Sequence, residues 1–275
     1  MLEQLIYKNH VNEVFEFGKD GIFVDTNDLH DYEWTATVKG NRIAAFDRSI
    51  SKRNLPVIII CDTEEKGILA RNKLLEVVEK DVLAMRHGKI IIGGYYFRCF
   101  VTKSQKKNYL TSKRWMEVTL TLTTDFPYWV KEETFLFSKA GEGGSGGVGL
   151  DSNYDYPFDY ASDVSVKEVN NTSFVATEFR MVIYGACSKP SIIVNGHEYQ
   201  VNCDVAASEY LTIDSATKKI YITANDGTTT NVFYMRNRES YIFEKIASGK
   251  SAVSWSGDFS FEITLLEERS EPKWI

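Results

Sequence analysis

The chain has 275 residues and a formal net charge of -6 at pH 7, with 43% hydrophobic and 25% charged residues. That length allows one large domain or two ordinary ones, and the composition is that of a folded globular protein. The acidic balance argues against a protein that grips a nucleic-acid backbone, because that task needs a basic face. We therefore expect no sequence-specific nucleic-acid binding.

The first residues, MLEQLIYKNH, contain no apolar run behind basic residues, so they do not read as a signal peptide. The aliphatic run at 57–60 is far too short to cross a bilayer. We expect synthesis in a cytoplasm and no membrane insertion. The four cysteines are Cys61, Cys99, Cys187 and Cys203, and they form no CxxC motif. We expect buried reduced thiols, and a disulfide between Cys187 and Cys203 stays possible.

The first half predicts several strands and one helix. Residues 15–17 and 22–24 flank a glycine-containing turn and predict a hairpin, and residues 34–38 and 57–61 read as strands. The segment 62–88 predicts a helix with Asp62 as N-cap, Glu65 closing a capping box and Gly88 just past its end. Its apolar stripe is expected to face the neighbouring strands: Ile68, Leu75, Val78, Val82 and Met85.

The segment RWMEVTLTLTTDF alternates Val118, Leu120 and Leu122 with threonines, which predicts a strand with one apolar face. The second half is almost wholly β in pattern. Short apolar runs alternate with turn signals at Asn195-Gly196, 214–218 and Asp226-Gly227. This spacing is typical of a β-sandwich.

Six glycines fall within the nine positions from Gly141 to Gly149. They separate a strand-rich α+β half from an all-β half, and such a run behaves as a flexible linker. We therefore predict an N-terminal α+β domain at 1–138, a linker at 139–153 and a C-terminal domain at 154–275.

No pattern in the sequence indicates catalysis. The glycine run lacks the lysine and the following helix of a phosphate-binding loop. The acidic stretch at 151–155 lacks the glycine and the glutamate of a calcium loop. The histidines and cysteines do not cluster as zinc ligands, and GxSxG is absent. We expect no catalytic residue, no metal, no cofactor and no enzyme activity.

Three tyrosines after the linker, Tyr154, Tyr156 and Tyr160, share one side of an extended segment. They could pack against the second domain or a neighbouring chain, or stack on sugar rings, and both interpretations stay open. Trp255 lies in an alternating strand and is expected in the core rather than on a ligand platform.

The last 45 residues resemble the C-terminal signature of the distal tail (Dit) family of siphophages and related prophages. The matching pieces are FEKI at 243–246, VSWSG at 253–257 and ERSEPKW at 268–274. Weaker likenesses in the first half are EKDV at 79–82 and DFPYW at 125–129. The positions that carry the signature are expected to be structural: Phe243, Gly249, Trp255, Gly257, Arg269 and Trp274.

This resemblance implies a structural virion protein of the tail tip or baseplate, made in the host cytoplasm. Its N-terminal domain would form a homohexameric ring, single or double, and its C-terminal domain would be a galectin-like β-sandwich. The ring would join the tail tube protein to tail-tip hub and receptor-binding proteins during host attachment. We expect the first-half strands, with Val118, Leu120 and Leu122, to supply the inter-subunit contacts.

An alternative function is a carbohydrate-binding module or adhesin. Its C-terminal sandwich would grip host cell-wall glycan, with the tyrosine-rich segment as contact surface.

Overall fold

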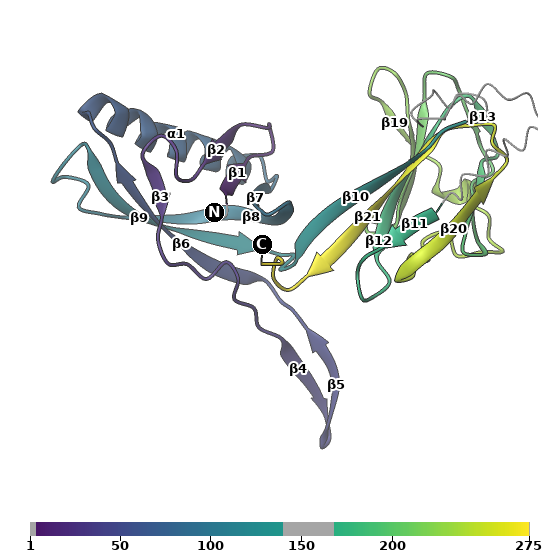
Figure 1. The fold of residues 1–275 in the computed structure, drawn as a ribbon, viewed down its shortest axis with the longest axis horizontal. Helices are drawn as coiled ribbons and strands as arrows, with labels where there is room; N and C mark the ends of the chain where they lie inside the picture. Colours follow the sequence, from purple (N-terminus) through teal and green to yellow (C-terminus); the bar gives the residue numbers. More distant parts are fainter. Residues whose placement is uncertain (1–3, 140–167, 275) are drawn as a thin grey trace, which may run out of the picture. The chain divides into compact units, whose positions relative to one another are not determined.

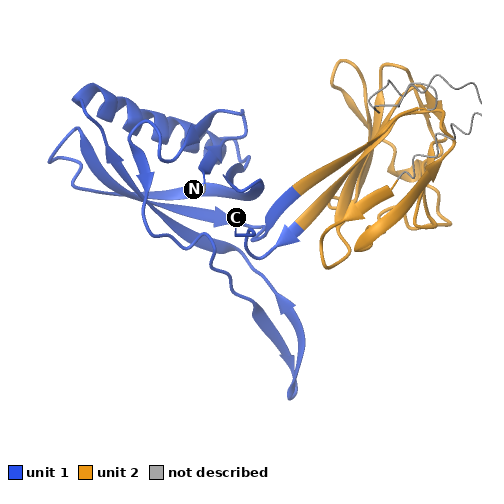
Figure 2. Ribbon diagram, viewed as in Figure 1, with its two compact units in different colours: residues 1–131, 268–275 blue, residues 132–267 orange. Residues whose placement is uncertain are grey.

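The computed structural model describes residues 4–139 and 168–274. Within these residues the chain is mainly β with one α-helix, as the sequence predicted. It divides into two compact units, residues 1–131 with 268–275, and residues 132–267 (Figure 2). The domain limits at 138 and 154 stay a prediction, because 140–167 lie outside the described residues. The same holds for the glycine run and for Tyr154, Tyr156 and Tyr160.

The first unit is built on antiparallel strands that pair in the order β2-β1-β7-β8-β9-β6-β3. Their bounds are β1 (Leu5–Lys8), β2 (Val14–Glu16), β3 (Ile22–Val24), β6 (Ser51–Ile60), β7 (Gly88–Ile92), β8 (Tyr95–Lys107) and β9 (Trp115–Thr124). The predicted hairpin of residues 15–17 with 22–24 is wrong. Strand β2 instead forms a hairpin with the preceding strand β1, and β3 pairs with the distant β6, so the two strands have different partners and do not pair with each other.

The helix α1 (Glu64–Leu83) packs against β6 and β8 (Figure 1). Its N-cap is Thr63, whose hydroxyl accepts a hydrogen bond from the backbone N–H of Lys66 at 3.3 Å. The predicted cap, Asp62, is therefore wrong by one residue. Both residue types can cap a helix, and the local backbone decides which one does: Thr63 has the extended conformation of an N-cap.

The buried face of α1 also differs from the prediction. Of the predicted stripe only Val78 is buried, whereas Ile68 and Met85 are 42% and 80% exposed. The buried face begins with two small residues and continues with larger ones: Gly67, Ala70, Leu74, Val77, Val78 and Asp81. The last helical residue is Leu83, with Ala84 as C-cap, and Met85 after it has a φ of 51°, so Gly88 is the first residue of β7 and not a cap.

Strand β9 follows the predicted alternation, with every second side chain buried. Val118, Leu120 and Leu122 are 2%, 1% and 0% exposed and belong to the first unit's core. A separate two-stranded hairpin, β4 (Thr35–Lys39) with β5 (Arg42–Asp47), projects from this unit away from α1 (Figure 1). We call residues 35–47 the arm.

The second unit is a β-sandwich, as predicted. One sheet has the order β19-β18-β17-β12-β21-β10 and the other β11-β20-β14-β15. Buried side chains from both sheets form one hydrophobic core. The bounds are β10 (Trp129–Phe137), β11 (Glu168–Asn171), β12 (Glu178–Tyr184), β14 (Ser191–Val194), β15 (His197–Gln200), β17 (Tyr210–Asp214), β18 (Lys219–Thr223), β19 (Thr229–Asn231), β20 (Gly249–Trp255) and β21 (Phe261–Arg269).

Smaller elements complete this unit: β13 (Cys187–Ser188) pairs with β16 (Asp204–Val205), and a 3-10 turn, η1, spans Phe233–Met235. The three predicted turns are confirmed, since they join β14 to β15, β17 to β18, and β18 to β19. At the first of them, Asn195 and Gly196 have φ of 49° and 81°, the left-handed values that such tight turns require.

Candidate assembly surface

The arm is amphipathic. Cross-strand partners share a face of a hairpin, and the register pairs Val38 with Ile43 and Ala36 with Phe46. Val38, Ile43 and Phe46 are 61%, 58% and 57% exposed. The opposite face carries the polar pairs Thr35–Asp47 and Lys39–Arg42, with Thr37 opposite Ala45.

An amphipathic hairpin outside a larger sheet is marginally stable in water by itself. Each residue of both strands is exposed, so the apolar face of the arm is not covered by the described part of the chain. A contiguous exposed apolar face of this kind marks a surface that binds another molecule. The arm is therefore the strongest candidate for an assembly contact in the first unit.

Arg48 fixes the base of the arm. Its guanidinium lies over the rings of Tyr32, Trp34 and Tyr128, at 5.7, 5.1 and 4.9 Å from their centroids. Its Nε also donates to the backbone carbonyl of Glu33 at 3.4 Å. Burial lowers the pKa of Arg48 from its usual value, yet an arginine keeps its charge at neutral pH. The arm thus leaves the sheet from a cation–π cluster that sets its direction.

A second apolar surface of this unit lies between α1 and β3. It is a groove of about 590 Å³ lined by Phe23, Ile60 and Leu69, which are 43%, 53% and 67% exposed. Two ion pairs stand at its rim, Lys73–Asp20 at 3.1 Å and Lys66–Asp62 at 3.6 Å. Strand β3 pairs only with β6 among the described strands, so it is a free sheet edge beside the groove.

The predicted inter-subunit residues lie elsewhere. β9 is flanked by β6 and β8, and the side chains of Val118, Leu120 and Leu122 point into the core of their own unit. An aspartate at Val118 would therefore act first by unfolding this unit. The arm residues were missed as a site because residues 34–38 were read as an ordinary strand, and sequence alone does not reveal the absence of a covering layer.

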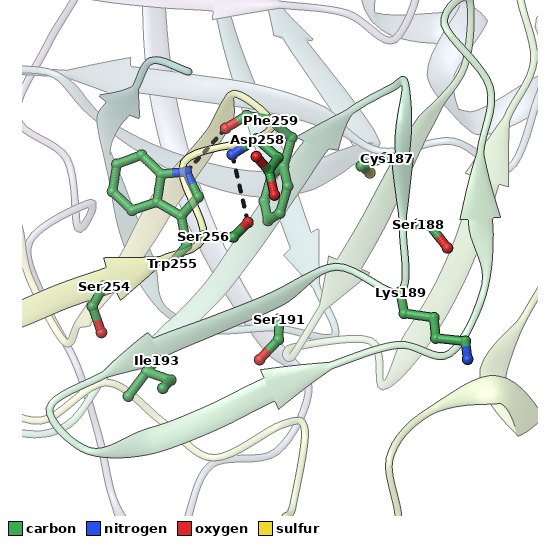
Figure 3. A pocket seen from close by; sticks show the side chains of 10 residues that line it. All are labelled: Cys187, Ser188, Lys189, Ser191, Ile193, Ser254, Trp255, Ser256, Asp258 and Phe259. Atoms are coloured by element: carbon green, nitrogen blue, oxygen red, sulfur yellow. Dashed lines mark hydrogen bonds between the residues drawn. The ribbon is translucent and has the colours of Figure 1, made fainter. Parts of the chain in front are cut away.

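The signature positions occupy structural places. Phe243 is buried in the second core, and Gly249 and Gly257, with φ of 88° and 86°, lie at the start of β20 and after its end. Trp255 is partly buried against that core, which confirms it as a packing residue, although it also lines a cavity (Figure 3). Arg269 ends β21, and Trp274 stacks on His30.

Among the described residues there is no group of three or more His, Cys, Asp or Glu side chains placed to hold a metal ion. In the same residues no helix is both long and apolar enough to cross a bilayer. The four cysteines are free thiols: Cys61, Cys99, Cys187 and Cys203.

The chain as a whole is similar to solved phage baseplate proteins. It matches a chain of the phage P2 baseplate in its activated conformation with Ca at a TM-score of 0.64 and 12% identity, over 99% of this chain and 100% of that one. The corresponding structure with Sr gives 0.64 and 13%, with the same coverage. The SPP1 Dit (gp 19.1) protein, described as a hub of the adsorption apparatus, gives 0.56 and 10%, over 98% of this chain and 100% of that one.

No family model and no curated protein sequence matches the chain. The fold is that of phage baseplate and Dit hub proteins. The likeness to the Dit family read from the sequence is confirmed at the level of the fold, over nearly the full length of both chains.

Proposed function

We propose that this protein is a structural component of a phage tail tip or baseplate, where it forms a hexameric ring between the tail tube and the host-attachment apparatus. The observation that carries this proposal is the likeness, over 98–99% of the chain, to baseplate and Dit hub proteins. Its place would be the virion tail tip, and its role would be structural rather than enzymatic.

The arm and the groove suggest how such a ring would close. The apolar face of the arm, with Ile43 and Phe46, would enter the groove between α1 and β3 of the next protomer. The arm points away from the helix of its own chain (Figure 1), so it does not cover its own groove. Two different surfaces of one chain make a head-to-tail contact, and such contacts generate rings when the rotation closes.

The proposed pairing rests on the apolar contact. Asp20 and Asp62 at the rim of the groove are each already paired with a lysine of their own chain, Lys73 and Lys66. The overall charge of -6 suits a ring that lets DNA pass without gripping it.

The second unit would then lie on the outside of the ring and offer a dock for tail-tip hub or receptor-binding proteins. The ring itself would contact the tail tube protein.

Light scattering tests the ring. A hexamer of the 31.4 kDa chain has a mass of about 188 kDa, and a double ring twice that. We expect Ile43→Asp to shift the mass to the monomer, because it places a charge on the apolar face of an exposed arm. Ala45→Asp, on the opposite face of β5, is the matched control and should leave the ring intact. A wild-type monomer at every concentration would contradict ring formation by the chain alone.

Cross-linking tests the pairing of arm and groove. A Val38→Cys chain mixed with a Leu69→Cys chain should give a covalent heterodimer with a short bismaleimide. Leu110→Cys is the control, at a position that is 86% exposed, more than Leu69 at 67%, on the loop between β8 and β9. If rings form and the control pair cross-links as well as the arm–groove pair, the ring proposal stands and this interface is wrong.

A further inference from the structure

The first unit contains an open cavity of about 520 Å³ that the proposed ring does not use. Its walls come from the end of β1, the residues after α1 and the start of β7. The groove proposed as the ring contact borders the other half of α1, at 66–73. Among the described residues that line the cavity none is acidic and five are basic: Lys8, His10, Arg86, His87 and Lys89.

The sheet places cations beside this cavity in one row. Lys8 of β1 is directly opposite Lys89 of β7, and Lys89 is directly opposite Arg98 of β8. Such partners share a face of the sheet, and like charges at these positions oppose strand pairing. The chain as a whole has a net charge of -6, so its overall composition does not explain this row. An anion held between the side chains would offset the repulsion.

His10 already has an anionic partner. Its Nδ1 lies 2.6 Å from Oδ1 of Asp81, and its backbone N–H donates to the same oxygen at 2.9 Å. The other oxygen of Asp81 accepts from Tyr7 Oη at 2.6 Å. The carboxylate of Asp81 is therefore used within the fold, and His10 belongs to the wall of the cavity rather than to its charge.

The other cations are not neutralised by the nearest loop. Glu13 pairs with Lys80 at 2.5 Å and accepts from the side-chain amide of Asn9 at 2.7 Å. Lys8 and Arg86 form no ion pair with any residue that the structure describes. Both charges are therefore available to a ligand.

His87 records the positive potential of the cavity. Burial lowers the pKa of its imidazole most, and Arg98 and Lys89 lower it further, whereas Asp125 and Asp81 act in the opposite direction. The ring is therefore mainly neutral at pH 7. A bound anion would favour its protonated form.

The end of the helix explains only part of this cluster. Basic residues just after a helix complement the partial negative charge of its last carbonyl groups, and Arg86 has such a position. That effect falls off within the last turn. Lys8 and Lys89 lie on strands, where a helix end gives no reason for two opposed lysines.

The arrangement of the donors distinguishes between anions. They come from three segments, with Lys8 on β1, Arg86 after α1 and Lys89 on β7. A carboxylate offers two oxygens in one plane, whereas a phosphate offers oxygens in a tetrahedral arrangement to donors from several directions. Arginine and lysine are both common phosphate ligands. The volume lies within the range of about 300–1,000 Å³ that is usual for small-molecule sites.

We propose that this cavity binds a phosphate group, with Lys8, Arg86 and Lys89 as its donors and His87 beside it. Inorganic phosphate, pyrophosphate and a nucleic-acid backbone share this chemistry, and the test separates these sources. The site does not depend on the ring proposed above.

The test titrates the full-length chain with phosphate, pyrophosphate and a short single-stranded oligonucleotide, in phosphate-free buffer at constant ionic strength. Binding is followed by NMR and calorimetry, and we expect it to saturate. Lys8→Gln and Arg86→Gln should each weaken it about tenfold, the loss expected when a hydrogen bond to a charged group is removed. Lys106→Gln makes the same change of charge at an exposed position of β8 that does not line the cavity, and it should bind as the wild type does.

The imidazole of His87 gives a second readout. Saturating phosphate should raise its pKa in an NMR titration, relative to chloride at the same ionic strength, because a nearby anion stabilises the imidazolium form. The Lys106→Gln control should show the same rise. Identical titration of His87 in phosphate and in chloride would contradict the proposal.

The outcomes separate the sources. Saturable binding of phosphate or pyrophosphate alone, lost in Lys8→Gln, supports a small-molecule site. Tighter binding of the oligonucleotide, lost in the same variant, supports the site and identifies a nucleic-acid backbone as its source. No saturable binding of any of the three by the folded wild type would overturn the proposal, and so would binding that survives both Lys8→Gln and Arg86→Gln. Light scattering on the same samples tests the ring separately, since a monomer that binds phosphate refutes only the ring.

Discussion

Trp274, next to the last residue of the chain, stacks on His30 with ring centroids 4.2 Å apart and planes 20° from parallel. Residues 268–275 thus belong to the first unit, although residues 132–267 form the second. The structure therefore places the segment 272–274 on the first unit. The adjacent Leu29 is buried, and its carbonyl accepts from Trp129 Nε1 at 3.3 Å, so the C-terminal segment contacts a well-anchored loop.

Trp274→Ala should weaken the contact between the C-terminal segment and the loop that contains His30. The loss of one aromatic stack predicts a decrease of about 1 kcal/mol in the free energy of unfolding of the first unit. Hydrogen exchange should show faster amide exchange at residues 28–31. Tyr234→Ala, which removes an exposed aromatic from the second unit, is the control and should leave these amides unchanged. Equal protection of residues 28–31 in both variants would contradict a structural role for the stack.

Asp81→Ala should destabilise the first unit strongly. The side chain of Asp81 is buried within α1 and accepts from Tyr7 Oη at 2.6 Å and from the backbone N–H of His10 at 2.9 Å. Its removal leaves these donors buried without an acceptor, so we expect a loss of about 2–4 kcal/mol in urea unfolding.

The matched control for that variant is Asp62→Ala. The side chain of Asp62 is 91% exposed, and its ion pair with Lys66 spans 3.6 Å. Exposed pairs contribute little, so the change should stay within about 0.5 kcal/mol. A similar effect of the two variants would show that the buried hydrogen bonds of Asp81 are not an important source of stability.

Gly67→Ala tests the contact between α1 and the loop before β9. By helix propensity alone the substitution should stabilise the protein by about 1 kcal/mol. However, a Cβ at Gly67 would lie 2.2 Å from the backbone carbonyl oxygen of Lys113. We therefore expect a net destabilisation of about 1–3 kcal/mol. Asn72→Ala, at an exposed position of the same helix, should instead stabilise by about 0.5 kcal/mol. Stabilisation by both changes would exclude the close approach.

Alkaline pH should destabilise the first unit through Cys99. Burial raises the pKa of this thiol from 9.0 to about 12, so the folded state favours the protonated form. The unfolded chain releases the proton above its ordinary pKa. Stability that is present below pH 9 is therefore lost as the pH rises from about 9 toward 12, by up to about 1.4 kcal/mol per pH unit for this one group.

Thermal unfolding at several pH values between 7 and 11 checks this effect. Cys99→Ala should be less stable at pH 7, because it leaves a small cavity, but should lose stability more slowly above pH 9 than the wild type. Parallel pH profiles for the two proteins would assign the alkaline loss to other groups, of which Tyr7, whose pKa burial also raises, is the first candidate.

Local patterns decided much of the fold. Alternation in β9 predicted which side chains are buried, and the turn at Asn195-Gly196 predicted a hairpin, because strand periodicity and left-handed turn residues act over a few neighbours. The existence of one long helix followed from the same kind of local signal. Its limits and buried face did not, since Asp62 and Thr63 are equally good caps in sequence.

Only the tertiary structure decided which surfaces remain uncovered. Val118 and Phe46 both lie in strands with apolar residues, yet Val118 is 2% exposed and Phe46 is 57% exposed. The difference is that β9 lies between two strands in a packed sheet, whereas β5 pairs with β4 alone among the strands that the structure describes. The place of Trp255 at a cavity likewise depends on β13 and β14, which are distant in sequence. Burial results from contacts between distant segments, and a sequence pattern records only the contacts between near ones.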